Sequence, residues 1–244
     1  MSKYAITVKD LHISYRTLKG FSIKKSLLKL KMSKTEVFEA VRGVSFEVEK
    51  GKILGIIGKN GSGKSTLLRS IAGIFSPDTG TIDLHGNSVS LLSIGVGFQN
   101  KLSGYENIFL SGMLLGFSEK EIKERVDEII EFSELGKFIY KPVSTYSSGM
   151  YSKLAFSITA ILETDIMLID EVFSVGDVKF KQKSYNKMKE LISDENRTVV
   201  IVSHSLGTLK ELCDTVLWLH DGKIKQVGDP EEVITAYEEF MKND

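Results

Sequence analysis

The stretch "GKNGSGKST", residues 58–66, carries the residue types of a phosphate-binding loop. Glycines let the backbone turn its N–H groups toward phosphate oxygens, and such loops space them as Gly58, four residues, then Gly63, Lys64 and Ser65. Lys64 would bring positive charge to the β- and γ-phosphates, and the Ser65 hydroxyl would bind Mg²⁺. A plain Gly/Ser turn is the alternative, but the loop follows the aliphatic run "ILGIIG" and precedes the helical pattern "LLRSIAGIF". The nucleotide-binding residues predicted here are Gly58, Lys59, Asn60, Gly61, Ser62, Gly63, Lys64, Ser65 and Thr66.

Two further aliphatic runs end in polar side chains. "IMLIDE", residues 166–171, ends in Asp170 and Glu171, and "TVVIVSH", residues 198–204, ends in His204. Buried strands of this kind place their last side chains at the carboxyl edge of a parallel sheet, where α/β proteins bind ligands. Asp170 would hold Mg²⁺, Glu171 would polarise the attacking water, and His204 would hydrogen-bond the γ-phosphate. The alternatives are a strand that runs into a polar turn and a surface histidine. The predicted catalytic residues are therefore Lys64, Glu171 and His204.

The stretch "YSSGM", residues 146–150, precedes the apolar run "KLAFSITAIL". A helix N-terminus leaves backbone N–H groups without partners and carries partial positive charge, so it can bind an anion. Serine is also a favoured N-cap residue, and these five letters by themselves favour an ordinary cap. The choice between a cap and an anion site depends on the rest of the chain.

The composition excludes several classes of protein. The chain has 244 residues with 32 basic and 32 acidic side chains, so its formal net charge is zero. This balance argues against a protein whose main role is to coat nucleic acid. The single cysteine, Cys213, excludes an internal disulfide framework. The N-terminal "MSKYAITVKD" has no apolar signal segment, and no apolar run approaches the roughly 18–20 residues that a membrane span needs. We therefore expect a soluble, cytoplasmic chain.

Short β-rich runs flank a more helical middle of the chain. They are "AITVKDL", "GVSFEV", "ILGIIG", "GTIDLHG", "IMLID", "TVVIVS", "TVLWLH" and "KIKQVG". The aliphatic runs indicate buried parallel strands, and the alternation in "VSFEVE" indicates a half-exposed antiparallel strand. In the middle, Ser103 and Ser118 each precede a glutamate by three residues, which is the capping-box spacing. We expect an α/β core, residues 1–97 and 166–244, interrupted by a helical subdomain at about 98–165.

These elements, in this order, resemble the nucleotide-binding subunit of an ATP-binding cassette (ABC) transporter over essentially the whole chain. "YSSGM" stands where that family has a signature of the Leu-Ser-Gly-Gly-Gln type, and "EVFSVGD", residues 171–177, stands where it has Glu-Pro-Thr-Ser-Ala-Leu-Asp. His204 matches the family's switch histidine. The resemblance implies a P-loop NTPase fold: an ABC cassette with a RecA-like core, an antiparallel β subdomain and the inserted helical subdomain. It also implies ATP and Mg²⁺ as cofactors.

The resemblance further implies that two cassettes pair head to tail as a homodimer. Each ATP would lie between one phosphate loop and the signature helix of the other subunit, and Asp177 would cross the interface. Ser148, Gly149 and the helix N-terminus would face the neighbour's γ-phosphate. A helix N-terminus suits that task because its dipole and bare N–H groups meet concentrated negative charge. The signature residues counted as nucleotide-binding are Ser147, Ser148, Gly149 and Met150, and because Met150 replaces the usual Gln, the role of that position stays open.

Three more positions take roles from the resemblance. Gln99 would contact Mg²⁺ and the membrane partner, although the stretch from Gln99 to Glu106 is shorter than in the common cassette. The predicted metal ligands are therefore Ser65, Gln99 and Asp170. Tyr15 would stack on adenine, with Phe38 as the competing candidate.

The particular residues in these motifs resemble those of one branch of the family. "YSSGMYSKLAFS", "EVFSVGD" and "FQNKLSGYENIFLSGMLLGFS" are similar to exporters of bacterial cell-surface polysaccharides such as O-antigen, capsule, teichoic acid and rhamnose polymers. This implies an ATPase at the cytoplasmic face of the membrane, paired with a multi-span permease and moving a lipid-linked glycan, with no nucleic acid as partner. The chain ends at "AYEEFMKND", so we expect no C-terminal carbohydrate-binding domain.

The alternative functions are an ATPase of another transport system and a non-transport ABC protein. A phosphate-loop kinase or GTPase would leave "YSSGM" unexplained, and the chain has no Asn-Lys-x-Asp guanine motif. The basic segment 16–34 contains no acidic residue, and its role has two interpretations. It either contacts an anionic membrane face or lipid-linked phosphate, or it is a solvated loop.

Overall fold

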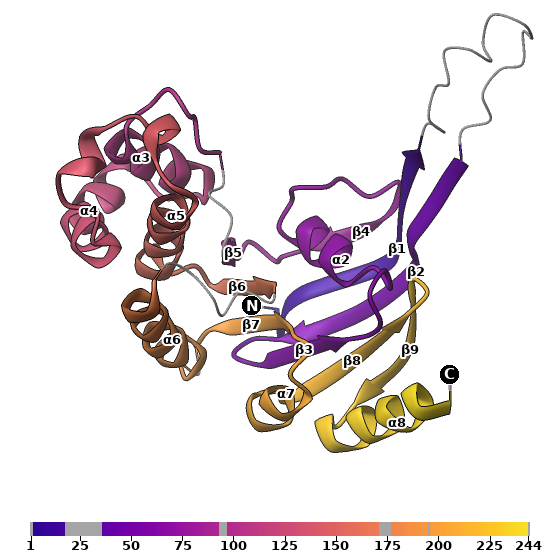
Figure 1. Ribbon diagram of the computed structural model, residues 1–244. Helices are drawn as coiled ribbons and strands as arrows, with labels where there is room; N and C mark the ends of the chain where they lie inside the picture. The colour runs from indigo at the N-terminus through magenta and orange to yellow at the C-terminus, as the bar shows by residue number, and fades with distance from the viewer. Residues whose placement is uncertain (1, 18–35, 93–96, 171–176, 195, 244) are drawn as a thin grey trace, which may run out of the picture.

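The computed structural model describes residues 2–17, 36–92, 97–170, 177–194 and 196–243 (Figure 1). The elements, in chain order, are β1 (Tyr4–Thr17), β2 (Glu36–Glu49), β3 (Ile53–Ile57), α2 (Lys64–Ile71), β4 (Thr79–Asp83), β5 (Val89–Leu92), α3 (Gly104–Leu114), α4 (Glu119–Ser133), η1 (Gly136–Tyr140), η2 (Val143–Thr145), α5 (Ser148–Leu162), β6 (Ile166–Asp170), α6 (Val178–Ile192), β7 (Thr198–Val202), α7 (Leu206–Leu212), β8 (Thr215–His220), β9 (Lys223–Gly228) and α8 (Pro230–Asn243). In this part of the chain, every helix is too short or too polar to cross a membrane.

A six-stranded sheet in the order β5-β6-β7-β3-β8-β9 forms the centre of the molecule. Strand β9 pairs antiparallel with β8, and all other neighbours pair parallel. Strand β7 is buried along its whole length, and β3 and β6 are buried except at one end residue. Their nearly continuous aliphatic sequences fit this position, because both faces of a parallel sheet are covered. The carboxyl ends of β3, β7 and β6 therefore lie side by side at one edge of the sheet.

A second sheet, antiparallel and in the order β2-β1-β4, packs against the central sheet. Its β1 and β2 form a long hairpin that projects beyond the rest of the molecule in Figure 1. Along β2, the buried Val44, Phe46 and Val48 alternate with exposed residues, as the alternating pattern predicts. These side chains join Leu67 and Leu68 of α2 and the facing side chains of the central sheet in one hydrophobic core. Helix α2 is thus fixed between the two sheets.

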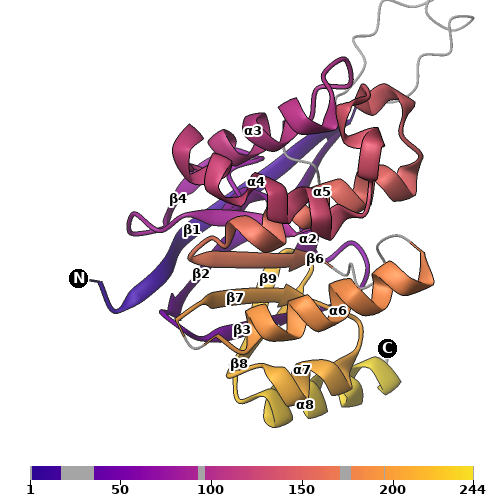
Figure 2. The same ribbon diagram turned by 90° about the vertical axis from the view of Figure 1, so that its left-hand side faces the viewer.

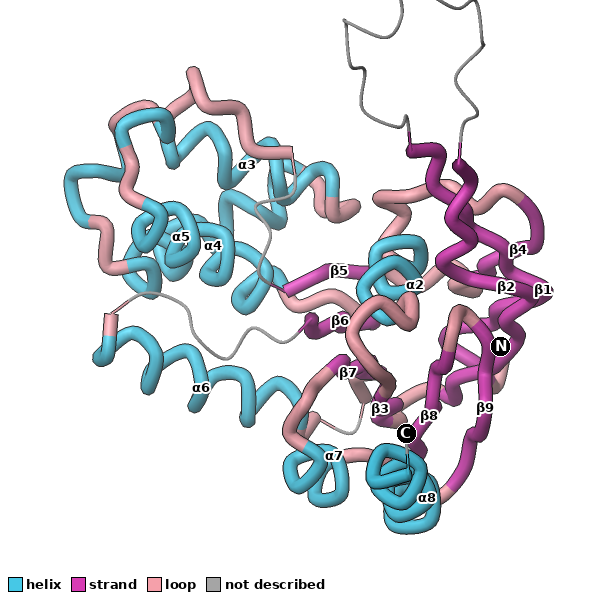
Figure 3. The backbone as a smooth tube through the Cα atoms, turned by 45° about the vertical axis from the view of Figure 1, so that its right-hand side comes forward, coloured by secondary structure: helices cyan, strands magenta, loops and turns pink. Residues whose placement is uncertain are grey.

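Helices α6, α7 and α8 cover the opposite face of the central sheet (Figure 3). Phe180 of α6, Leu209 of α7 and Val233 of α8 are fully buried against this face. Trp218 of β8 packs edge-on against Phe240 of α8, with ring centroids 5.3 Å apart. The central sheet is therefore covered on both faces, which explains why its strands read as unbroken apolar runs.

Helices α3, α4 and α5 pack together beyond one edge of the central sheet (Figure 2). Ser103 and Ser118 form capping boxes at the starts of α3 and α4, which confirms both predicted caps. The apolar residues of α4 recur at helical spacing, and Ile122, Val126 and Ile129 are buried in a core shared with α3 and α5. This group has a hydrophobic core distinct from the two cores of the central sheet.

The α/β fold and each of the expected strands are confirmed, with two differences. Strand β5, "VSLL", was not predicted, because four residues are too few to show a period. It becomes a strand by pairing with β6, where Leu91 faces Leu168. Strands β1 and β2 also extend further than the short predicted runs, since their mutual pairing continues to Thr17 and Glu36. The residue limits of the helical subdomain stay a prediction.

A buried asparagine closes the loop that leads into α3. The side-chain amide of Asn107 donates to the carbonyl oxygens of Gln99 at 3.1 Å, Leu102 at 3.3 Å and Ser103 at 2.8 Å. Its Oδ1 accepts the backbone N–H of Gln99 at 2.7 Å. Each of the three carbonyl oxygens also accepts a backbone N–H, from Leu102, Val143 and Asn107 in turn, so Asn107 adds a second donor to them and supplies the acceptor for the N–H of Gln99. Because Asn107 is fully buried, water does not readily replace its side chain at these groups.

The first prediction tests this loop. We expect Asn107→Leu to lower the free energy of unfolding by about 2–4 kcal/mol, because it leaves the backbone N–H of Gln99 without its side-chain partner and places an apolar side chain against three carbonyl oxygens. The matched control is Asn186→Leu on the exposed surface of α6, which removes a hydrogen bond from Gln182 and should cost less than about 0.5 kcal/mol. Urea denaturation measures both values, and equal losses would contradict the anchoring role of Asn107.

Candidate functional site

The glycine-rich loop between β3 and α2 packs its backbone directly against two strands. Gly58 has φ 152° and Gly63 has φ 102°, conformations that residues with a side chain rarely adopt. A Cβ atom at Gly58 would lie 2.1 Å from the carbonyl oxygen of Leu219 in β8, and one at Gly63 would lie 2.2 Å from that of Ala40 in β2. Only glycine therefore fits at these two points, and the backbone of the loop is held close to both sheets.

The Lys64 side chain folds back over this loop. Its ammonium donates to the carbonyl oxygens of Gly58 at 2.7 Å and Lys59 at 3.0 Å. An ammonium group has three N–H donors, so one more donor can serve an anion. Burial lowers the pKa of Lys64, while the Asp170 carboxylate acts in the opposite direction. A phosphate group beside Lys64 would add negative charge and favour its protonated form.

Ser65 and Asp170 meet although 105 positions separate them in the chain. The Ser65 hydroxyl donates to Oδ1 of Asp170 at 3.1 Å. Ser65 lies in the first turn of α2, and Asp170 is the last residue of β6. The contact brings together a hydroxyl and a carboxylate oxygen, which are ligand types that Mg²⁺ prefers.

A pocket of about 200 Å³ lies over the glycine-rich loop. Its lining residues are Phe38, Ala40, Asn60, Gly61, Gly63, Lys64, Ser65, Thr66, Val202 and His204. His204 reaches it because β7 pairs with β6 and β3, and Asp170 stands opposite Val202 in that pairing. The structure thus brings His204 beside the loop, as the order of the strands predicts. Glu171, the predicted base, lies outside the described residues.

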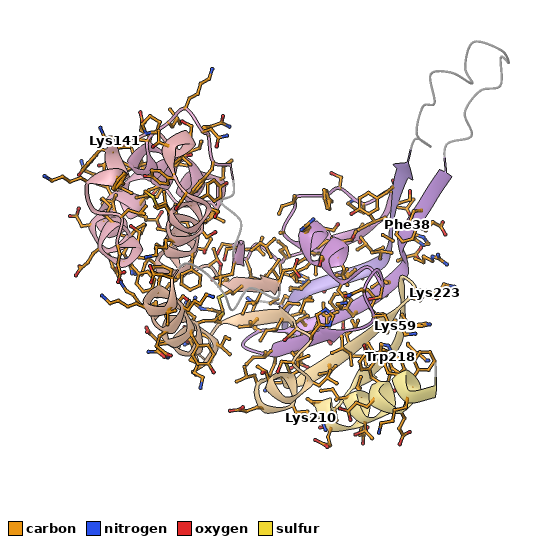
Figure 4. The ribbon with its side chains drawn as sticks, in the orientation of Figure 1. Phe38, Lys59, Lys141, Lys210, Trp218 and Lys223 are labelled. Atoms are coloured by element: carbon orange, nitrogen blue, oxygen red, sulfur yellow. The ribbon has the colours of Figure 1, made fainter. Side chains whose placement is uncertain are left out.

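The two aromatic candidates for adenine stacking contact the loop in different ways. Tyr15 and Phe38 are register partners across the β1–β2 hairpin. The Tyr15 hydroxyl is hydrogen-bonded to the Thr66 hydroxyl at 3.0 Å, and its ring meets Phe75 edge-on at 6.1 Å. Phe38 is 51% exposed and borders the pocket, on β2 in Figure 4. The choice between them stays a prediction, with the pocket favouring Phe38.

The predicted metal ligand Gln99 lies in the loop that Asn107 closes. Its backbone is held by that buried side chain, and the residue itself is exposed. Among the described residues, those that line the loop pocket do not include Gln99. Its role as a ligand of Mg²⁺ stays a prediction.

The stretch "YSSGM" lies at the start of helix α5 and includes the N-cap that its serines predict. Ser147 is the N-cap, and its hydroxyl oxygen accepts the backbone N–H of Met150 at 3.2 Å. Ser148 is the first residue of the helix. Ser147, Gly149 and Met150 line a second pocket of about 400 Å³, together with Asp177. The predicted signature residues therefore lie around a different pocket from the one over the glycine-rich loop.

Asp177 is held by two groups of its own chain. One carboxylate oxygen accepts the backbone N–H of Phe180 at 3.0 Å, which caps α6, and the other accepts from the ammonium of Lys153 at 2.6 Å. The hydrogen bond from Lys153, followed by that from Phe180, lowers the pKa of Asp177 to about 2. Asp177 is therefore a carboxylate at neutral pH. That Asp177 crosses the interface between two cassettes stays a prediction.

Sequence reasoning missed Lys153 and its second carboxylate partner, Glu134. The ammonium of Lys153 also lies 3.8 Å from a carboxylate oxygen of Glu134. A signal was present, since Lys153 follows Gly149 by four residues and thus shares a helix face with the predicted signature. The spacing along α5 does not indicate Glu134, because that residue follows the end of another helix, α4.

Comparison with known proteins decides the family. The profile of the ABC transporter family matches residues 41–174, more than half of the chain. The chain belongs to the ABC transporter family. The matched stretch contains the glycine-rich loop, the signature stretch and Asp170.

Several curated relatives of this ABC cassette are named for export. The O-antigen export system ATP-binding protein RfbB of Myxococcus xanthus is 43% identical over 97% of this chain and 56% of its own length. The teichoic acids export ATP-binding protein TagH of Lactococcus lactis is 49% identical over 89% of this chain and 46% of its own. TagH of Staphylococcus epidermidis is 42% identical over 98% of this chain and 89% of its own. The chain thus spans about half the length of the first two relatives.

Solved structures show the same fold at low sequence identity. The ATP-binding subunit of an ABC transporter matches with a TM-score of 0.71 and 23% identity, over 96% of this chain and 93% of that one. A dimeric ATP-binding cassette in a post-hydrolysis state, bound to ADP and Pi, matches with a TM-score of 0.68 and 20% identity, over 92% and 98% of the two chains. The fold of this chain is therefore that of an ABC cassette.

The second prediction concerns the close packing of the loop. Gly61 and Gly63 both have positive φ, but a Cβ at Gly61 meets nothing within 4 Å. We expect Gly63→Ala to lower the free energy of unfolding by about 1–3 kcal/mol more than Gly61→Ala, because only the first forces the loop away from Ala40. Urea denaturation of both variants measures the difference. Equal losses would mean that backbone strain alone, without the steric clash, determines the cost.

Proposed function

We propose that this cassette is the ATP-hydrolysing subunit of an exporter that moves a lipid-linked cell-surface polysaccharide across the cytoplasmic membrane. The observation that carries the ATPase part is the meeting of Lys64, the Ser65–Asp170 pair and His204 around the glycine-rich loop. The export part is supported by relatives named for O-antigen and teichoic acid export, at 42–49% identity. The peripheral location at the membrane follows from the partner proposed below.

The residues of the loop fit ATP with Mg²⁺. Backbone N–H groups of the loop would bind the phosphates, and the remaining N–H donor of Lys64 would neutralise charge on the β- and γ-phosphates. Mg²⁺ is usually held in such sites by one or two protein oxygens together with phosphate oxygens and water. Ser65 and Asp170 supply two oxygens already in contact. When bound, Mg²⁺ would offset the charge that develops on the phosphates.

The chain's own residues then have distinct tasks. Glu171 follows Asp170 directly in the sequence, and we assign it the role of the base that accepts a proton from the attacking water. His204 would donate a hydrogen bond to the γ-phosphate from the end of β7. Phe38, which borders the pocket, would stack on the adenine ring.

A second copy of this cassette would complete the site. The capping bond of Ser147 uses the N–H of Met150, and Ser148 and Gly149 precede it in the first turn, where a helix has no internal acceptors for N–H groups. These N–H groups and the helix dipole suit the γ-phosphate bound by a partner cassette. A similar fold has been solved as a dimer bound to ADP and Pi, which supports this pairing.

An apolar groove between the central sheet and the helical group suits the permease. It has a volume of about 190 Å³, and its lining includes Ile74 after α2, Leu91 of β5 and Leu114 of α3. Leu114 is 58% exposed, and the neighbouring Met113 is exposed as well. Exposed apolar side chains that gather at one place are typical of a protein contact. We assign this groove to a multi-span permease, consistent with the export systems named for the relatives.

The lipid-linked substrate is assigned from the relatives and from the basic segment 16–34. Most of that segment lies outside the described residues, so the assignment depends on its sequence. Its lysines, with no acidic residue among them, would attract lipid-linked phosphate at the membrane surface.

The third prediction tests hydrolysis. We expect Glu171→Gln to bind ATP as the wild type does, to lose about 10²–10⁴-fold in turnover, and to accumulate a dimer when ATP is present. Phosphate release, ATP binding and sedimentation measure the three properties. Lys64→Met serves as the contrasting variant, because it should weaken ATP binding itself. Turnover of Glu171→Gln near the wild-type rate would refute the role of Glu171.

The fourth prediction tests the groove. We expect Leu114→Asp to abolish co-purification of the cassette with a multi-span permease from its host membranes, since a carboxylate in an apolar contact leaves an unpaired charge. The ATPase rate of the isolated cassette should stay within about twofold of the wild type, because surface substitutions usually have small effects. Met241→Asp, at an exposed apolar position on α8, is the matched control and should retain the permease. Loss of the permease from both variants, or from neither, would contradict the assignment.

A further inference from the structure

Lys59 belongs to the glycine-rich loop, but its side chain reaches the C-terminal helix. Its ammonium lies 5.6 Å from the centre of the Phe240 ring on α8. At that distance, the face of an aromatic ring attracts a cation. Among the described residues, those that line the pocket over the loop include the neighbouring Asn60 but not Lys59. The side chain of Lys59 therefore attaches the loop to α8, while its backbone remains part of the loop.

The backbone of Lys59 holds the lysine that would bind phosphate. Its carbonyl oxygen accepts the ammonium of Lys64 at 3.0 Å, and that of Gly58 accepts the same ammonium at 2.7 Å. An ammonium has three N–H donors, so the two carbonyl oxygens determine the direction in which the third donor points. A shift of the Lys59 carbonyl would therefore redirect the donor that is to meet the phosphates.

Phe240 is a firmly held partner for Lys59. Its half-buried ring packs edge-on against Trp218 of β8, with centroids 5.3 Å apart, and against His220, with centroids 5.1 Å apart. The ammonium of Lys225 on β9 lies 3.2 Å from the centre of the same ring. Figure 4 labels Lys59 and Trp218, which meet this ring from the loop and from the sheet. The ring is thus fixed to the central sheet and gives Lys59 a defined anchor.

The C-terminal strands support the loop at two further points that do not involve this ring. The N–H of Gly222, in the turn between β8 and β9, donates to the carbonyl oxygen of Ser62 at 3.1 Å. The backbone of β8 also leaves no room for a Cβ atom at Gly58. Both contacts remain when Phe240 is replaced, so the loop should keep its place while the side chain of Lys59 loses its anchor.

We propose that Phe240 is a positioning residue for ATP binding, which acts through Lys59 on the ammonium of Lys64. This inference rests on the proposed ATP site and adds α8 to the elements that support it. A loop already held in its bound arrangement loses less conformational freedom when the ligand binds. Loss of the ring should therefore weaken ATP binding. Hydrolysis of bound ATP should change little, because its groups lie at the ends of β6 and β7.

The fifth prediction compares Phe240→Leu with Phe240→Tyr. We expect Phe240→Leu to raise the KM for ATP and the Kd for ADP by about threefold to tenfold, a range typical of a lost cation–π contact. Its kcat should stay within about twofold of the wild type. Phe240→Tyr keeps the ring face and should retain most of the affinity. Phosphate release measures kcat and KM, and calorimetric titration with ADP measures affinity without hydrolysis.

Two controls separate the anchor from the packing of α8. Tyr237→Leu removes another aromatic contact of the same helix, since the Tyr237 ring packs edge-on against Trp218 with centroids 5.4 Å apart. Lys225→Met removes the other cation over the Phe240 ring. We expect both variants to bind ADP within about twofold of the wild type. If Tyr237→Leu weakens ADP binding as much as Phe240→Leu does at a similar melting temperature, the positioning role is refuted.

A double-mutant cycle identifies Lys59 as the link. We expect Lys59→Met to weaken ADP binding, and adding Phe240→Leu to it should have less than about a twofold further effect, because both changes remove one contact. Full additivity, or a fall of kcat as large as the rise in KM for Phe240→Leu, would overturn the inference. A wild-type protein that binds ADP and ATP without hydrolysis would overturn the proposed function and leave the positioning role standing. A wild-type protein that binds neither nucleotide would overturn both.

Discussion

The parallel pairing of β6, β7 and β3 is the constraint on which the candidate site depends. Neighbouring strands lie about 4.8 Å apart, so whatever follows their carboxyl ends is brought together at one edge of the sheet. The glycine-rich loop follows β3, His204 follows β7, and Asp170 ends β6. The contact between Ser65 and Asp170 is a direct result of this pairing. Packing of the loop against β2 and β8, where no Cβ fits, then fixes the backbone that would bind phosphates.

The helical group adds a second set of residues that the sheet alone does not position. Its own core keeps α3, α4 and α5 together, and the loop closed by Asn107 lies where the chain enters it. Contacts between charged side chains, centred on Lys153, connect this group to α6. The candidate site therefore has two parts: the carboxyl edge of the central sheet, and the helical group that charged side chains connect to α6.

The predictions from sequence succeeded where the signal was local. Strands with aliphatic or alternating patterns, the capping boxes at Ser103 and Ser118, and the cap at Ser147 were all foreseen, because each depends on neighbours within a few residues. The glycine-rich loop was foreseen for the same reason. Strand β5 was missed because it depends on pairing with β6. The positions of Tyr15 and Phe38 relative to the pocket were left open, because both lie on one hairpin and only its packing on the loop distinguishes them.

The sequence by itself determined the class of fold, the phosphate-loop chemistry and the family of this protein, since motif spacing and apolar periodicity are properties of the chain read in order. Only the tertiary structure decided which distant residues meet. The partnership of Asp177 with Lys153 and the link from Lys153 to Glu134 arise where the second turn of α5 lies beside the end of α4 and the start of α6. Nothing in the local pattern specifies such a contact, because its energy depends on the distance and burial of groups that the fold alone brings together.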